Sequence, residues 1–165
     1  MTRIEIASNI CKEFEGLKLQ AYLCPAGKWT IGYGSTFYEN GTTVRKGDKI
    51  TVEQANKLLE ITIKSFDKDL DLLIKTTLTE NQRGALLDFA FNVGSDIDSD
   101  TIAEGLGDST LLKKVNANPN DKTIAQEFMK WNKFRNPKTG AVEVLAGLTR
   151  RRQKEAAVYF QTMAN

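Results

Sequence analysis

A capping box followed by a long apolar stripe constrains the fold more than any other feature of the sequence. The box is Thr51-Val52-Glu53-Gln54, in which the threonine and glutamine side chains can close the first turn of a helix. Apolar residues then recur at steps of three and four, which is helical spacing: Ala55, Leu58, Leu59, Ile63, Phe66, Leu70 and Leu73. We therefore expect a long amphipathic helix over residues 51–76, which either connects two lobes or lies within one body.

A second capping box, Thr79-Glu80-Asn81-Gln82, predicts another helix that is almost entirely apolar on one side. This helix is expected to end at Gly94, because glycine is the usual residue after a helix C-terminus. The rest of the chain predicts an acidic loop over 95–108, a short helix capped by Ser109 and reaching Val115, a helix over 123–134, a turn over 136–140 and a last helix from Leu145 or Leu148 to Met163.

The first fifty residues change from helical to strand-like spacing at Glu15. A helix is predicted up to Glu15, with Gly16 as its C-cap. Apolar and polar residues then alternate, and Asn40-Gly41 is a strong signal for a hairpin turn. We therefore expect about three short antiparallel strands between residues 17 and 50, and an α+β fold for the whole chain.

Glu15 is expected to stand at a helix C-terminus, facing this small sheet. The C-terminal end of a helix carries partial negative charge, which disfavours a second negative charge beside it. An apolar surround would act in the same direction and favour the protonated acid, the form that a general acid needs. The alternative is an ordinary surface glutamate beside a glycine cap, and these residues alone leave both readings open.

The absence of histidine excludes several kinds of site. Ser-His-Asp and Cys-His catalysis and histidine-ligated zinc all require an imidazole. The two cysteines have no metal-ligand spacing; Cys11 shares the apolar face of the first helix, whereas Cys24 lies in the strand region, and a bridge between them stays open. Asp96 to Asp100 has acids at alternate positions, but Thr101 replaces the glycine of a calcium loop, so we expect no metal and no cofactor.

Charge and hydropathy place few demands on a partner. The net charge of +2 is mild, and the basic run Arg150-Arg151-Arg152 is too short to predict a nucleic-acid partner. That run is expected either to form a solvated patch or to turn one arginine inward to meet an acid. The N-terminus lacks the apolar stretch of a signal peptide and no segment could span a bilayer, so we expect synthesis in a cytoplasm without membrane insertion.

Three residues near the N-terminus carry a resemblance to a known family. Glu15, Cys24 and Thr30 follow the spacing of the phage-type lysozymes (glycoside hydrolase family 24): Glu, eight residues, Asp or Cys, five residues, Thr. Further matches are Gln82 to Gly94, Ser109 to Leu112 and Gly147 to Glu155, so the resemblance extends over essentially the whole chain.

The resemblance implies an endolysin that hydrolyses the β-1,4 bond between N-acetylmuramic acid and N-acetylglucosamine in peptidoglycan. It implies one lysozyme domain with a sheet lobe (1–50), a connecting helix (51–76) and a helical lobe (77–165), acting as a monomer after release through holin-made holes. The implied catalytic residues are Glu15, Cys24 and Thr30, and the implied cleft residues are Gly34, Phe91, Ser109 and Thr110.

The role of Cys24 stays open between thiolate base, covalent nucleophile and a group that orients water with Thr30, and so does the stereochemical course. Two other readings remain: a lytic transglycosylase that uses Glu15 alone, and a non-catalytic wall-binding module.

Overall fold

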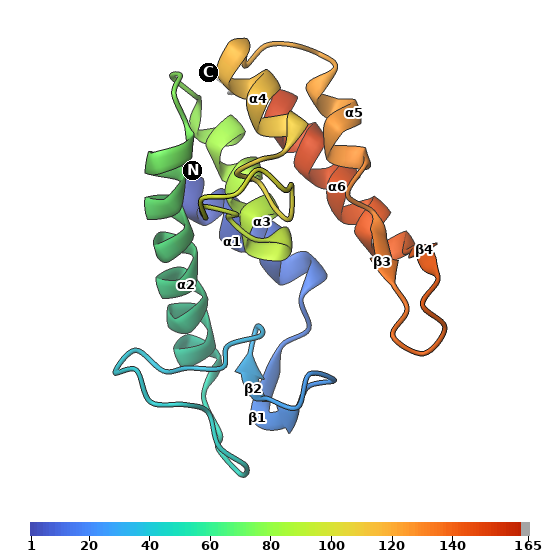
Figure 1. The fold of residues 1–165 in the computed structure, drawn as a ribbon. Helices are drawn as coiled ribbons and strands as arrows, with labels where there is room; N and C mark the ends of the chain where they lie inside the picture. The colour runs from blue at the N-terminus through green and yellow to red at the C-terminus, as the bar shows by residue number, and fades with distance from the viewer. Residues whose placement is uncertain (163–165) are drawn as a thin grey trace.

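The computed structural model describes residues 1–162 and shows helices gathered around one central helix, with a small sheet region at one end (Figure 1). No helix in this range is long and apolar enough to cross a membrane. The helices are α1 (Arg3–Phe14), α2 (Val52–Leu73), α3 (Glu80–Val93), α4 (Thr110–Ala117), α5 (Ile124–Met129) and α6 (Ala146–Phe160), and the strands are β1 (Lys18–Leu23), β2 (Trp29–Gly32), β3 (Lys133–Arg135) and β4 (Val142–Val144). The mixture of helices with two small antiparallel sheets confirms the α+β class.

The start signals read from the sequence are confirmed. Thr51 and Thr79 each accept a hydrogen bond from the backbone N–H three residues on, and the glutamine side chain there accepts one from the backbone N–H of the threonine. Thr2 forms a third box with Glu5, which the sequence analysis did not identify. Gly94 ends α3 with a φ of 106°, a conformation open mainly to glycine.

The helical body is built around α3, which packs against α1, α2 and α6. All side chains from Gly84 to Ala90 are buried, so α3 has no fully solvated face in that stretch. Phe89 makes edge-to-face contacts with Phe128 of α5 and with Trp131 at ring-centroid distances of 5.6 and 5.5 Å. A side chain at position 84 would clash with Ile6 of α1, so only glycine allows the two helices to pack this closely.

The sheet region lies at the N-terminal end of α2 (Figure 1). The expectation of about three strands is wrong: β1 pairs with β2, and the remaining pairings are isolated bridges such as Phe37–Thr43. Tight turns at Gly41 and Gly47, both with positive φ, leave too few consecutive residues for a third strand. A small apolar cluster of Ile31, Val44 and Leu58 joins this region to α2.

Two other boundaries differ from the prediction. Glu15, with extended backbone, caps α1, so Gly16 is not the cap. The helix expected over 123–134 ends at Met129, and the chain continues into the β3–β4 hairpin, which projects from the helical body (Figure 1). Its turn is closed by the backbone of Asn136, which bonds Ala141 and Gly140. The last helix ends at Phe160, and the predicted end at Met163 lies outside the described residues.

Candidate active site

Glu15 lies where α1 ends and the sheet region begins, as expected, and it is held by an arginine from the far end of the chain. Nη1 of Arg151 donates a hydrogen bond of 2.7 Å to Oε1 of Glu15. The arginine side chain is 4% exposed and that of Glu15 is 31% exposed, so the carboxylate has one buried partner and one open side. The apolar surround expected from the sequence is therefore incomplete, because a guanidinium lies against the acid.

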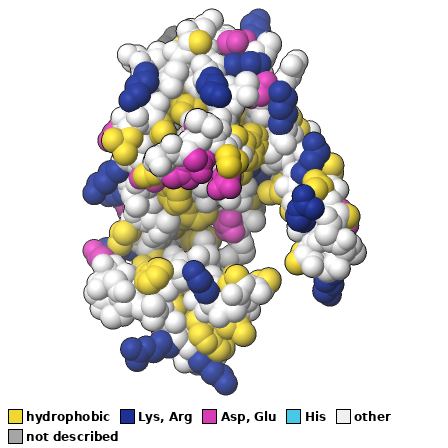
Figure 2. Space-filling model, in the orientation of Figure 1, with side chains coloured by type: hydrophobic (Ala, Val, Ile, Leu, Met, Phe, Trp, Pro, Cys, Tyr) yellow, Lys and Arg dark blue, Asp and Glu magenta, His cyan; other side chains and the backbone are white. Residues whose placement is uncertain are grey.

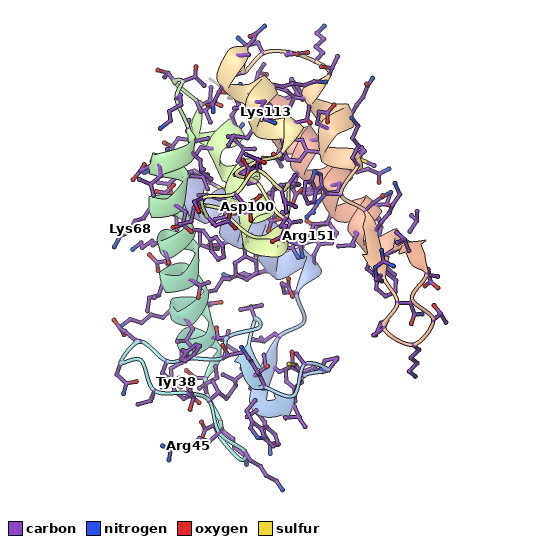
Figure 3. All side chains as sticks on the ribbon, viewed as in Figure 1. Tyr38, Arg45, Lys68, Asp100, Lys113 and Arg151 are labelled. Atoms are coloured by element: carbon purple, nitrogen blue, oxygen red, sulfur yellow. The ribbon has the colours of Figure 1, made fainter. Side chains whose placement is uncertain are left out.

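Arg151 is itself fixed by a carboxylate on α3. Nε and Nη2 of Arg151 donate to the two oxygens of Asp88 at 2.9 and 2.7 Å, a bidentate pair. Asp88 has no exposed surface. Although burial opposes it, the hydrogen bonds and charge of Asp88 raise the pKa of Arg151, which therefore stays charged. Figure 3 labels Arg151 where α6 faces the end of α1.

In the basic run 150–152, two arginines point inward, whereas the sequence predicted either a solvated patch or one inward arginine. Arg150 is exposed, whereas Arg151 and Arg152 are buried. Arg152 donates from Nη2 to Glu155 at 2.7 Å and to Asn92 at 2.8 Å. The inward arginines thus meet acids of three different segments rather than forming a solvated patch.

A cavity of about 890 Å³ opens beside Glu15. It lies between the end of α1 and the beginning of α6, and its walls include Leu148, Arg150 and Lys154. Figure 2 shows an open notch on this face between the sheet region and the projecting hairpin. The exposed side of the Glu15 carboxylate therefore faces a space large enough for sugar rings, with positive charge along one wall.

Cys24 and Thr30 lie on the β1–β2 hairpin, where the strands exchange backbone hydrogen bonds near its turn. The Thr30 hydroxyl is buried and donates to the carbonyl of Lys28 at 3.1 Å, which leaves its lone pairs free to accept. Hydrogen bonds from the backbone amides of the turn, that of Lys28 most strongly, lower the pKa of the Cys24 thiol. The hairpin therefore makes the Cys24 thiol more acidic than a free cysteine.

Cys11 behaves differently from Cys24. It is fully buried on α1, beneath Arg151, whose Nη2 lies 3.6 Å from the sulfur. Burial raises its pKa far above the ordinary thiol value. Both cysteines are free thiols, so the bridge between them that the sequence left open is absent.

The four expected cleft residues fall into two places. Gly34 and Phe91 line one cavity of about 190 Å³ between the sheet region and the helices α2 and α3. Ser109 and Thr110 line a different cavity, of about 320 Å³, beside Trp131. The Ser109 hydroxyl caps α4 by accepting from the Leu112 amide, so it has a structural task already.

Carboxylates of the acidic loop accept hydrogen bonds from the loop's own backbone, and Asp96 accepts the most. Oδ2 of Asp96 accepts hydrogen bonds from the backbone amides of Glu104, Gly105 and Asp108. The three acids that lie closest together are Asp96, Asp98 and Asp108, so Asp100 of the calcium-like pattern is not among them. The loop is held by these bonds, in agreement with its reading as a loop.

Asp88 and its link to Glu15 were not identified from the sequence. The signal was present, since Asp88 is the one acid within the apolar stretch from Ala85 to Phe91. A charge on such a face needs a buried partner of opposite sign. The partner could not be named, because Arg151 lies 63 positions away along the chain.

Comparison with known sequences finds one family and several relatives. The family model described as phage lysozyme matches residues 12–155. An endolysin of Acyrthosiphon pisum secondary endosymbiont phage 1 is 40% identical over 150 residues, which cover 91% of this chain and 92% of that protein. An endolysin of Bacillus phage B103 is 37% identical over 92% of this chain, which spans only 51% of that longer protein.

Solved structures agree with the sequences. The endolysin from Escherichia coli O157:H7 phage FAHEc1 superposes with a TM-score of 0.83 and is 33% identical, over 100% of this chain and 97% of that one. The muramidase domain of SpmX from Asticaccaulis excentricus gives a TM-score of 0.78, also at 33% identity, over 94% and 95% of the two chains. The fold and the sequence therefore point to the same group of proteins.

Proposed function

We propose that Glu15 is the general acid of this chain, which belongs to the phage lysozyme family and is a glycoside hydrolase of bacterial peptidoglycan. The bond cleaved is the β-1,4 linkage from N-acetylmuramic acid to N-acetylglucosamine. The observation that carries the proposal is the placement of Glu15: one side of the carboxylate binds buried Arg151, and the other faces the large cavity. A fixed acid with an open side can reach a glycosidic oxygen.

Arg151 supports the acid in two ways. Its hydrogen bond to Oε1 fixes the carboxyl group and leaves Oε2 for the substrate. Once Glu15 has given its proton to the leaving group, the guanidinium stabilises the carboxylate that remains. The arginine therefore assists the step in which negative charge develops on the enzyme.

The Cys24–Thr30 pair supplies the other half of the reaction. An oxocarbenium-like centre must be captured by a nucleophile or by an activated water. The lowered pKa of Cys24 supports a role as base or nucleophile, and the free lone pairs of Thr30 suit it to hold a water molecule.

The surroundings suggest how the polymer lies. We place the cleft between a lobe of residues 1–50 and a lobe of residues 77–165, joined by the segment 51–76, with Gly34 and Phe91 along its extension. Ser109 and Thr110, which line a separate cavity, would contact the polymer only at a distance from Glu15. The enzyme works as a monomer without a cofactor, reaches the cell wall by a holin-type release, and does not depend on nucleic acid or membrane insertion.

The test of the general acid is Glu15→Gln, with Glu13→Gln as a matched control. Glu13 lies two residues away and lines the same cavity, but its partner is the exposed Lys154. Clearing of a cell-wall suspension should be abolished by Glu15→Gln and retained by Glu13→Gln, with both variants folded by circular dichroism. Near-normal clearing by Glu15→Gln would remove Glu15 from this role.

The test of the second group is Cys24→Ser. A hydroxyl is a far weaker base and nucleophile than a thiolate near neutral pH. Large loss of clearing with normal wall binding assigns the sulfur to base or nucleophilic chemistry, whereas little loss leaves only the orientation of water. Trapping of a glycosyl adduct on Cys24 by mass spectrometry separates the nucleophile from the base.

A further inference from the structure

Behind the Arg151–Glu15 pair, the molecule contains a second layer of buried charges that the reaction itself does not use. Asp88, Arg152 and Glu155 all have less than 1% of their surface exposed. Isolated charges at such depth would be very costly, so their arrangement needs an account.

The layer contains two carboxyl groups in direct contact. Glu155 lies on α6 beside Arg152, and its carboxyl group approaches that of Asp88 on α3, since Nε of Arg151 lies 2.9 Å from Asp88 and 4.0 Å from Glu155. Two carboxylates cannot both be ionised at hydrogen-bond distance in a buried site, so one of them carries a proton. Asp88 already accepts two hydrogen bonds from Arg151, which favour its charged form. The proton therefore belongs on Glu155.

An unpaired atom supports the same assignment. Oε2 of Glu155 lies 2.7 Å from Nε of Arg152, yet neither atom has a hydrogen-bond partner of acceptable geometry. An ionised oxygen without a hydrogen bond is costly when buried. Burial, and then the hydrogen bond with Asp88, also raise the pKa of Glu155 well above its ordinary value.

Charged groups of three helices surround this layer. Around the site, α1 contributes Glu15 and the neutral thiol of Cys11, α3 contributes Asp88, and α6 contributes the two inward arginines. With the proton on Glu155, Asp88 is the carboxylate that offsets the charge of the arginines behind Glu15. The positive charge felt by Glu15 is thus limited by the carboxylate behind the arginine.

We propose that Asp88 and Glu155 are positioning residues for Glu15. Glu155 stays protonated and donates a hydrogen bond to Asp88, and Asp88 fixes Arg151 against the acid. Asp88 also offsets the charge of Arg151, which lies directly against the Glu15 carboxyl group. This inference rests on the proposed role of Glu15.

The experiment is the pH profile of cell-wall clearing at saturating substrate. It compares Glu155→Gln with the double variant Asp88→Asn/Glu155→Gln, because a free Glu155 could ionise and replace the missing charge. Compared with Glu155→Gln, the double variant should have its alkaline limb about one pH unit lower. At a given pH on that limb, its clearing rate should be about tenfold lower. Coincident limbs would overturn the inference.

The matched control is Asp67→Asn. Asp67 of α2 likewise binds arginine side chains, those of Arg3 and Arg83, but it forms no hydrogen bond or ion pair with Glu15 or Arg151. Its loss tests whether removal of any arginine-bound carboxylate shifts the profile, and we expect no shift. A shift of the same size in Asp67→Asn would assign the effect to general destabilisation.

A second measurement needs no variant of Asp88. The difference between the wild-type and Glu155→Gln infrared spectra at neutral pH should contain the C=O band of a protonated carboxyl group, because the variant lacks the Glu155 contribution. A difference spectrum without the band would overturn the assignment of the proton. The two proposals fail in different ways. A fully active Glu15→Gln would refute the general acid, and with it the positioning role, but would leave the infrared assignment of the proton intact. Coincident profiles beside an inactive Glu15→Gln would refute only the positioning pair.

Discussion

Replacing Arg151 by methionine should destabilise the fold strongly, because the arginine is the shared partner of two carboxylates. Methionine replaces the unbranched stem of the arginine side chain but carries no charge, so the main effect is electrostatic. Asp88, which has no exposed surface, would lose both of its short hydrogen bonds to arginine. Removing one partner of a buried ion pair costs about 3–5 kcal/mol, because the other charge is left uncompensated.

The magnitude can be read from unfolding in urea or by heat, followed by circular dichroism. For a chain of this size, about 1 kcal/mol corresponds to about 2–4 °C, so the melting temperature should fall by about 6–20 °C. The control is Arg150→Met, since Arg150 is the exposed neighbour and should change stability by less than about 0.5 kcal/mol. If Arg151→Met costs less than about 1 kcal/mol, the buried network does not stabilise the fold as described.

Three further perturbations test other parts of the structure. Iodoacetamide should alkylate Cys24 in the native protein but Cys11 only after denaturation, as mapped by mass spectrometry; equal rates would contradict the opposite pKa shifts. Burial raises the pKa of Glu155 in the folded state, so the stability given by its protonated form is complete below about pH 4.5 and declines as the pH rises. Urea unfolding should therefore show Glu155→Gln gaining on the wild type by about 1.4 kcal/mol per pH unit above that value, and a constant difference would contradict this. Gly84→Ala would place a methyl group 2.6 Å from Ile6 and should cost about 1–3 kcal/mol in thermal unfolding; a neutral result would contradict the close contact.

Features set by neighbouring residues were predictable from the sequence. The boxes at Thr51 and Thr79 and the cap at Gly94 each depend on a few consecutive residues, and each is where the sequence placed it. The trio of Glu15, Cys24 and Thr30 was likewise visible as a spacing. The surroundings of the trio could not be predicted in this way, because the hydrogen bonds that lower the pKa of Cys24 depend on the shape of its turn.

Features set by distant contacts were not predictable. The apolar spacing of Ile124, Phe128 and Trp131 continues as if the helix did, yet the chain leaves α5 at Met129 and forms the β3–β4 hairpin. The pair Asp88–Arg151 joins segments 63 positions apart. Local spacing carries no information on which arginine reaches which acid, because that choice depends on how α3 and α6 pack.

The most direct test of the central claim is mass and anomer analysis of the fragments released from cell walls digested in ¹⁸O-labelled water. A hydrolase that protonates the leaving oxygen through Glu15 and delivers water from the opposite half of the site adds one labelled oxygen to each new muramyl end. We predict reducing ends that each carry one ¹⁸O, and none from Glu15→Gln. Anhydro-muramyl ends without label would contradict hydrolysis and assign the enzyme to the lytic transglycosylases.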